Sequence, residues 1–131
     1  MSYVLAVGND EETALLDHAF NGFPGRVPVT CMEKGLNVWN FISGRLPSEF
    51  PLLIIIDQHL SDVDSLALLL RIKADQHLKL IPVAMISSNV SRQEIHDYYR
   101  AGANCFYKKP ADRSDWNHMA ECLLTLFIDR P

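Results

Sequence analysis

The sequence predicts an α/β protein built on a doubly wound, five-stranded parallel sheet. Short aliphatic runs alternate with segments of helical periodicity along all 131 residues. Two of these runs, LLIII at 52–56 and LIPVAMI at 80–86, are apolar throughout, which is typical of parallel strands that are buried on both faces. Adjacent parallel strands need a helix-length return, so the alternation implies crossover connections.

Five strands and five helices are expected, with no internal repeat, low-complexity tract or linker between them. The expected strands cover residues 3–7, 27–32, 52–56, 80–86 and 103–107. The expected helices begin near residues 10, 34, 64, 91 and 113, and the last three end near residues 74, 102 and 128. The first strand ends at Gly8, and the acidic residues after it suit a helix N-terminus.

The helices are predicted from apolar spacing and from start and stop signals. In the first helix Leu16, Phe20 and Phe23 share one face, and the Gly and Pro residues of segment 22–25 end it. The fourth helix begins with SRQE at 91–94, a capping box in which Ser and Glu side chains satisfy each other's backbone amides. Its end is predicted at a glycine, in the usual position for a helix C-terminus.

Composition excludes several classes of function. Sixteen acidic residues against twelve basic ones give a formal charge of -4, and no basic run is longer than Lys108-Lys109, so nucleic acid is not an expected partner. Cys31, Cys105 and Cys122 lack the paired spacing of a zinc or redox site, which favours reduced thiols in a cytoplasmic protein. No apolar run approaches the roughly 20 residues of a membrane-spanning helix, so we expect no membrane.

Polar side chains gather at the carboxyl ends of the expected strands, the edge where doubly wound folds bind their ligands. The residues expected at this edge are Gly8, Asn9, Asp10, Asp57, Ser87, Ser88 and Lys109. An Asp after a strand is by itself more often a cap or turn former. A carboxylate, a hydroxyl and an ammonium that converge from separate strands instead suit a phosphoryl group, with the carboxylate as nucleophile and the other two on its oxygens. A hard cation such as Mg²⁺ is expected beside them.

Three segments resemble a response-regulator receiver domain. They are IIIDQHLSDVDSLALLLRIK, IPVAMISS and AGANCFYKKP, in that order along the chain. The resemblance covers nearly the whole sequence, so we expect residues 1–131 to form a single receiver domain with the flavodoxin-like (βα)5 fold.

The resemblance also implies roles for individual residues. Asp57 would accept a phosphoryl group from a phosphohistidine on a histidine kinase or a phosphotransfer protein. Ser87 and Lys109 would bind the oxygens of that group, and Phe106 would occupy the aromatic switch position. A cis Lys109–Pro110 peptide bond, which turns the lysine toward the site, is implied as well.

The first strand departs from the family pattern. The family normally ends this strand with two acidic residues that hold Mg²⁺, whereas this chain has Gly8 and Asn9. Asn9 offers an uncharged oxygen, and Asp10 either swings in to replace the missing acid or belongs to an acidic cluster at the helix start. His59 would present its backbone carbonyl, so the expected metal ligands are Asp57, Asn9, Asp10 and that carbonyl.

The loop after Asp57 also differs, with Ser61 where the family often has Pro and Ser65 where it usually has Gly. Two hypotheses remain. In the first, the chain is a two-component signalling receiver, a phosphoacceptor and no enzyme beyond that, which signals when Ser87 moves inward and Phe106 rotates. In the second, it is a phosphorylation-independent pseudo-receiver. Either would bind a downstream protein through the face of the fourth helix, fifth strand and fifth helix.

Overall fold

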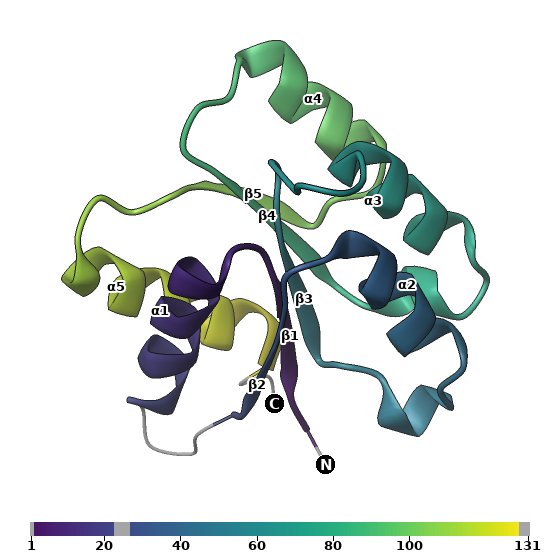
Figure 1. Ribbon diagram of the computed structural model, residues 1–131, viewed down its shortest axis with the longest axis horizontal. Coiled ribbons are helices and arrows are strands. Elements are labelled where there is room, and N and C mark those ends of the chain that lie inside the picture. Colours follow the sequence, from purple (N-terminus) through teal and green to yellow (C-terminus); the bar gives the residue numbers. More distant parts are fainter. Residues whose placement is uncertain (1, 23–26, 129–131) are drawn as a thin grey trace.

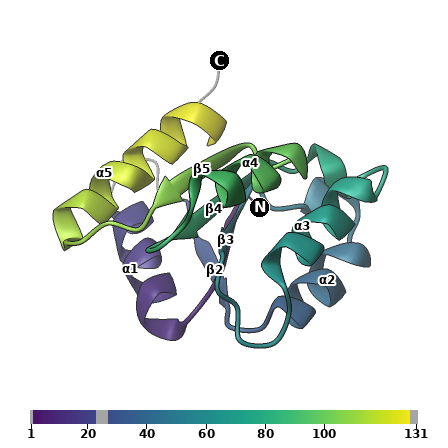
Figure 2. The same ribbon diagram turned by 90° about the horizontal axis from the view of Figure 1, so that it is seen from above.

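The computed structural model describes residues 2–22 and 27–128, which form one parallel sheet covered by helices on both faces (Figures 1 and 2). The strand order is β2-β1-β3-β4-β5, so the predicted doubly wound α/β fold is confirmed. The strands are β1 (Val4–Val7), β2 (Val29–Met32), β3 (Leu53–Asp57), β4 (Val83–Ser87) and β5 (Cys105–Lys108). The helices are α1 (Asp10–Asn21), α2 (Gly35–Ser43), α3 (Ser65–Ala74), α4 (Arg92–Arg100) and α5 (Arg113–Leu123).

Two hydrophobic clusters hold the helices to the sheet. Successive strand residues point to opposite faces, so each central strand feeds both clusters. The strand residues that contact α1 and α5 are Val4, Ala6, Leu53, Ile55, Ala84 and Ile86. Those that contact α2, α3 and α4 are Leu5, Val7, Ile54, Ile56, Val83 and Met85. This two-sided burial explains why the central runs are aliphatic at every position.

The ladder pairing brings the carboxyl ends of the strands to one edge of the sheet. Val7 pairs with Ile56, and Asp57 at the next position pairs with Ile86. Ser87 in turn pairs with Lys108. Residues that follow β1, β3, β4 and β5 therefore emerge together at the end of the sheet opposite the N-terminus (Figure 1).

Several predicted boundaries are wrong by a few residues. The fourth strand begins at Val83 instead of residue 80, because residues Leu78–Leu80 form a 3₁₀ turn that leaves Leu80 exposed. The second strand begins at Val29, directly after a proline that has no amide proton for a ladder bond. The last helix gives way to a π turn over Leu124–Ile128.

The predicted signals around α4 are confirmed. Ser91 and Glu94 form the capping box, and Gly102 follows the helix in a left-handed conformation with φ 111°. The three cysteines are free, as expected, and burial raises the pKa of Cys105 to about 11. Phe23, with the Pro and Gly that follow it, lies outside the described residues. Within the described part of the chain, no helix combines the length and apolar character needed to cross a membrane.

Candidate functional site

Asp57 ends β3 and lies almost fully buried, with 3% of its surface exposed. Its Oδ2 accepts a hydrogen bond from Lys109 Nζ at 2.7 Å, and its Oδ1 accepts one from the His59 amide at 2.9 Å. The structure therefore brings together the carboxylate and the ammonium that the sequence predicted at this edge, although they lie 52 positions apart in the chain.

The end of β1 passes close beside this carboxylate. A Cβ atom placed on Gly8 would lie 3.2 Å from Asp57 Cβ and 3.6 Å from its Oδ2. The first of these contacts is tighter than most Cβ contacts and the second is ordinary, so the absence of a side chain at Gly8 eases the close approach of the two strand ends.

Lys109 is anchored by its backbone and directed by its side chain. Its amide donates to the Ser87 carbonyl at 2.8 Å, and its Nζ donates to Asp57 and to Glu12 Oε1, the latter at 2.8 Å. Burial lowers the pKa of Lys109, but the hydrogen bonds and negative charges of the two carboxylates outweigh burial and raise that pKa above its ordinary value.

The cis peptide bond predicted before Pro110 is wrong. No described residue has a cis peptide bond, so the Lys109–Pro110 bond is trans. The lysine still reaches Asp57, because its amide is fixed on β4 and its flexible four-carbon stem covers the remaining distance.

Glu12 is the residue of this site that the sequence prediction missed. It lies in the first turn of α1, where Asn9 Oδ1 caps the helix by accepting a hydrogen bond from the Glu12 amide at 2.8 Å. The Glu12 carboxylate in turn accepts from Asn9 Nδ2 and from Lys109 Nζ. The available signal was the N-cap-to-N3 spacing of Asn9 and Glu12, which folds the N3 side chain back toward the helix start.

Two of the expected metal ligands, Asn9 and Asp10, belong to the start of α1. Asn9 Oδ1 serves as the helix cap, and Asp10 is exposed in the first turn of α1. Both Asp57 oxygens already accept hydrogen bonds, from Lys109 and His59. In residues 2–22 and 27–128, no group of three or more His, Cys, Asp or Glu side chains could hold a metal ion. The residues present therefore do not fit the ion that the family resemblance implies.

Ser87 lies on the neighbouring strand with its hydroxyl turned toward its own loop. The side chain is fully buried, and its Oγ donates to the Asn89 carbonyl at 3.2 Å and accepts from the Asn89 amide at 3.3 Å. Ser87 therefore lies on the strand next to that of Asp57. In the described part of the chain, the two side chains form no hydrogen bond with each other.

Phe106 lies at the contact between β5 and α4. Its ring packs edge-on against Tyr98, with centroids 5.4 Å apart and planes at 67°. Its amide donates to the Tyr99 hydroxyl at 3.1 Å. Phe106, for which the resemblance implies a switch role, is therefore in direct contact with α4.

A polar network joins the residue after Asp57 to α4. Gln58 is buried, and its Nε2 donates to Glu94 at 2.7 Å. The Gln58 carbonyl accepts from Ser65 Oγ at 2.6 Å, and that oxygen lies 2.6 Å from the Tyr98 hydroxyl. Gln58 thus contacts the first turn of α4 directly, at Glu94, and the last turn through Ser65, at Tyr98.

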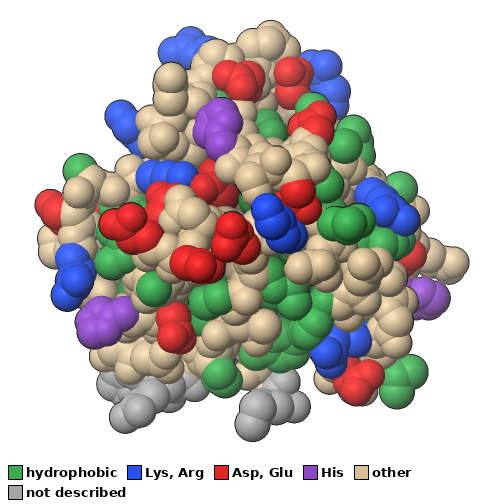
Figure 3. Space-filling view, in the orientation of Figure 1, with side chains coloured by type: hydrophobic (Ala, Val, Ile, Leu, Met, Phe, Trp, Pro, Cys, Tyr) green, Lys and Arg blue, Asp and Glu red, His purple; other side chains and the backbone are tan. Residues whose placement is uncertain are grey.

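The surface near the site is acidic. Asp10, Glu11 and Glu12 all lie in the first turn of α1. Figure 3 shows acidic side chains gathered over the start of that helix, on the face turned toward the viewer. This negative charge reaches Lys109 itself, because Glu12 contacts the Lys109 ammonium.

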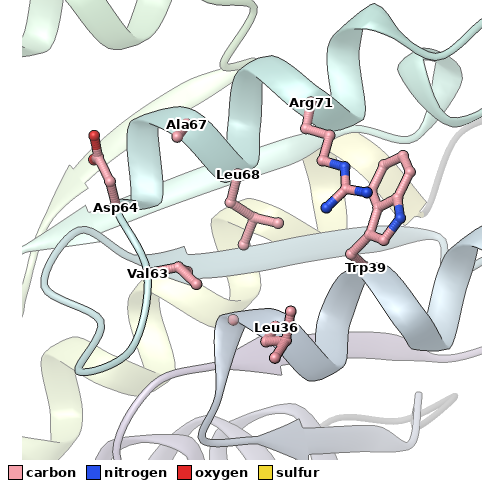
Figure 4. Close-up of a pocket in the computed structure, with 8 residues that line it drawn as sticks. Leu36, Trp39, Val63, Asp64, Ala67, Leu68 and Arg71 are labelled. Atoms are coloured by element: carbon pink, nitrogen blue, oxygen red, sulfur yellow. The ribbon is translucent and has the colours of Figure 1, made fainter.

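A separate pocket of about 150 Å³ lies between α2 and α3 (Figure 4). Leu36, Val63 and Leu68 supply apolar walls, and the Arg71 guanidinium stacks 3.9 Å above the Trp39 ring. None of the residues at the carboxyl edge lines this pocket, so it is no part of the candidate site.

Comparison with solved structures identifies the class of fold. The chain is similar to the phosphorylated cyanobacterial phytochrome response regulator RcpA, with a TM-score of 0.86 and 21% identity over 98% of this chain and 96% of that one. It is also similar to the Mn(2+)-bound form of response regulator Rcp1, with a TM-score of 0.83 and 19% identity over the same shares. The fold is that of response-regulator receiver domains, as the sequence resemblance predicted.

Sequence relatives of the chain include chemotaxis proteins. The chain is 26% identical over 78 residues to the chemotaxis protein CheY1 of Helicobacter pylori, and the match covers 60% of each chain. It is 33% identical over 57 residues to the chemotaxis protein CheY-3 of Vibrio cholerae, and that match covers 44% of each. The matched segments therefore span less than two thirds of these relatives. No family model matches the chain.

Proposed function

We propose that this chain is a cytoplasmic receiver of two-component signalling that accepts a phosphoryl group on Asp57. The donor would be a phosphohistidine on a histidine kinase or a phosphotransfer protein. A carboxylate oxygen of Asp57 forms a bond to phosphorus while the phosphorus–nitrogen bond breaks, and the leaving imidazole keeps the electron pair and takes up a proton. The observation that carries this proposal is the 2.7 Å contact between Lys109 Nζ and the buried Asp57 carboxylate.

Each neighbouring group has a task in this reaction. Lys109 supplies positive charge where negative charge accumulates on the phosphoryl oxygens, and the His59 amide holds the other carboxylate oxygen in place. The Ser87 hydroxyl, now bonded within its loop, would turn to meet a phosphoryl oxygen. That movement would open space toward which Phe106 rotates.

The network around Gln58 gives the change at Asp57 a route to α4. A shift of the loop after Asp57 moves Gln58, which is bonded to Glu94 and, through Ser65, to Tyr98. The face formed by α4, β5 and α5 would then present an altered surface to a downstream protein.

The exposed side of α4 indicates the charge of that protein. Arg92, His96 and Arg100 are exposed and lie one helical turn apart. In the described part of the chain no carboxylate forms an ion pair with either arginine. In a chain of net charge -4, this stripe favours an acidic partner surface.

The second candidate is an interaction module that binds its partner through this same face whether or not Asp57 is modified. The missing acidic pair at Gly8 and Asn9, together with the lack of a magnesium ligand set in the described residues, favours it. The retained Asp57–Lys109 pair favours the phosphoacceptor.

Incubation with a small-molecule phosphodonor, followed by an acid quench and intact mass measurement, separates the two candidates. We expect the wild type to gain the mass of one phosphoryl group and Asp57→Asn to gain none. Asp115→Asn changes an exposed aspartate on α5 and is the matched control, which should gain the same mass as the wild type. A wild type that gains no mass, either with Mg²⁺ or with chelator, supports the interaction module.

A further inference from the structure

We infer that the Lys109 ammonium, shared between Asp57 and Glu12, is the resident counter-charge of this site and takes the place that a divalent cation holds in the family. The inference deepens the proposed function, because it states how a phosphoacceptor carboxylate is neutralised here. It concerns the unphosphorylated protein, so it can be tested separately from phosphoryl transfer.

The first argument is the supply of ligands. A divalent cation of this kind needs several oxygen ligands, carboxylates above all. The end of β1 offers none of the usual acids. Gly8 has no side chain, and the side-chain oxygen of Asn9 accepts a hydrogen bond from the Glu12 amide. A side chain at Gly8 would also make a tight contact, because its Cβ would lie 3.2 Å from Asp57 Cβ.

The second argument is the place of the ammonium. Lys109 Nζ lies 2.7 Å from Asp57 Oδ2 and 2.8 Å from Glu12 Oε1, so one cation bridges two carboxylates from different elements. A metal ion bound to the same two oxygens would face the ammonium at close range, and like charges repel at such distances. The ion and the lysine therefore compete for one location.

The third argument concerns Glu12, which completes the arrangement from α1. Its carboxylate is fixed by Asn9 Nδ2 on one side and by Lys109 on the other. The side chain is 20% exposed and that of Lys109 is 12% exposed, so the contact is shielded from water. Glu12 is thus a positioning residue that holds Lys109 against Asp57.

Manganese titration followed by electron paramagnetic resonance measures cation binding without any phosphorylation step. We expect no saturable Mn²⁺ binding by the wild type at millimolar concentrations. Lys109→Met leaves the Asp57 and Glu12 carboxylates without their cation. It should therefore bind Mn²⁺ with a dissociation constant at least tenfold below the highest concentration at which the wild type shows no saturation. The gain should vanish in Lys109→Met/Glu12→Gln and persist in Lys109→Met/Glu11→Gln, the matched control in the same helical turn.

Thermal unfolding supplies a second readout. Added Mg²⁺ should raise the melting temperature of the Lys109→Met variant and leave that of the wild type unchanged, because a ligand stabilises only the state that binds it. If Lys109→Met does not fold, Lys109→Gln removes the charge and retains a hydrogen-bond donor. Saturable Mn²⁺ binding by the wild type at millimolar concentrations, or a Lys109→Met variant that binds Mn²⁺ no better than the wild type, would overturn the inference.

Phosphorylation with and without chelator links the inference to the proposed function. A wild type that gains the phosphoryl mass at the same rate in both conditions supports both. Phosphorylation that requires Mg²⁺ overturns the inference and retains the function. A complete failure to gain mass refutes the proposed phosphoacceptor function. The manganese titration then still tests whether Lys109 is the counter-charge of Asp57.

Discussion

Replacing Lys109 by Met should destabilise the protein through the charge that it leaves behind on Asp57. This carboxylate is 3% exposed, and its remaining hydrogen-bond donor would be the His59 amide. Removing one partner of a buried ion pair costs roughly 3–5 kcal/mol. Since the His59 bond persists and the lysine is not fully buried, we expect the lower end, about 3 kcal/mol of unfolding free energy.

A double-mutant cycle isolates the charge from the rest of the lysine side chain. Asp57→Asn removes the carboxylate charge, so adding Lys109→Met to it should cost about 1 kcal/mol or less, which gives a coupling energy of about 2 kcal/mol. Urea unfolding at neutral pH, followed by circular dichroism, measures all four free energies. Lys108→Met, a change at the exposed neighbour, is the matched control and should be near neutral.

The result that would refute this reasoning is additivity. If Lys109→Met costs the same in the wild type and in the Asp57→Asn background, the ion pair contributes no net stability. The loss would then reflect packing of the lysine stem.

Three further predictions follow from single contacts. Tyr98→Phe removes the buried hydroxyl that forms a hydrogen bond with Ser65, so it should lower the free energy of unfolding, measured in urea, by about 1 kcal/mol. An unchanged free energy would show that this hydrogen bond contributes no net stability. Gly102→Ala forces a φ of 111° on a residue with a Cβ that would lie 2.8 Å from the Lys73 side chain. The cost should be about 1–3 kcal/mol by thermal unfolding, and a neutral variant would contradict the assigned backbone. Because the folded protein raises the pKa of Lys109, its contribution is complete below the ordinary pKa of 10.5 and is lost as pH rises through the folded value. Wild type should therefore lose more stability than Lys109→Met in alkaline urea titrations, and parallel losses would argue against the shift.

The sheet could be predicted from sequence because two-sided burial leaves a strong local signal. Every residue of β3 and β4 is buried, and aliphatic runs of this kind fit few other structures. The strand starts were less accurate, since apolar residues also occur in turns beside the sheet. Leu80 continues the apolar run before β4, yet it belongs to a 3₁₀ turn and is 77% exposed.

Asp57 and Lys109 could be predicted to meet because topology alone brings strand ends to one edge. Glu12 escaped prediction because its role depends on the direction of its side chain. The Asn9 cap orients the first turn of α1, and the Glu12 carboxylate folds back to contact both Asn9 and Lys109. The cis form of the peptide bond before Pro110 was inferred from the family resemblance alone. The bond is trans, and the Lys109 side chain still reaches Asp57.

The two departures from the family pattern lie on opposite sides of Asp57 and act on different properties of the site. At the end of β1, the loss of acidic side chains removes charge and leaves Lys109 as the cation in contact with the carboxylate. At the start of α3, Ser65 replaces the usual Gly with a hydroxyl that joins the Gln58 carbonyl to Tyr98. Because Tyr98 also packs on Phe106, this serine adds a polar link between the loop after Asp57 and the switch residue. The departure at the end of β1 therefore weakens the case for a metal, whereas the departure at Ser65 adds a physical connection from the loop after Asp57 to α4.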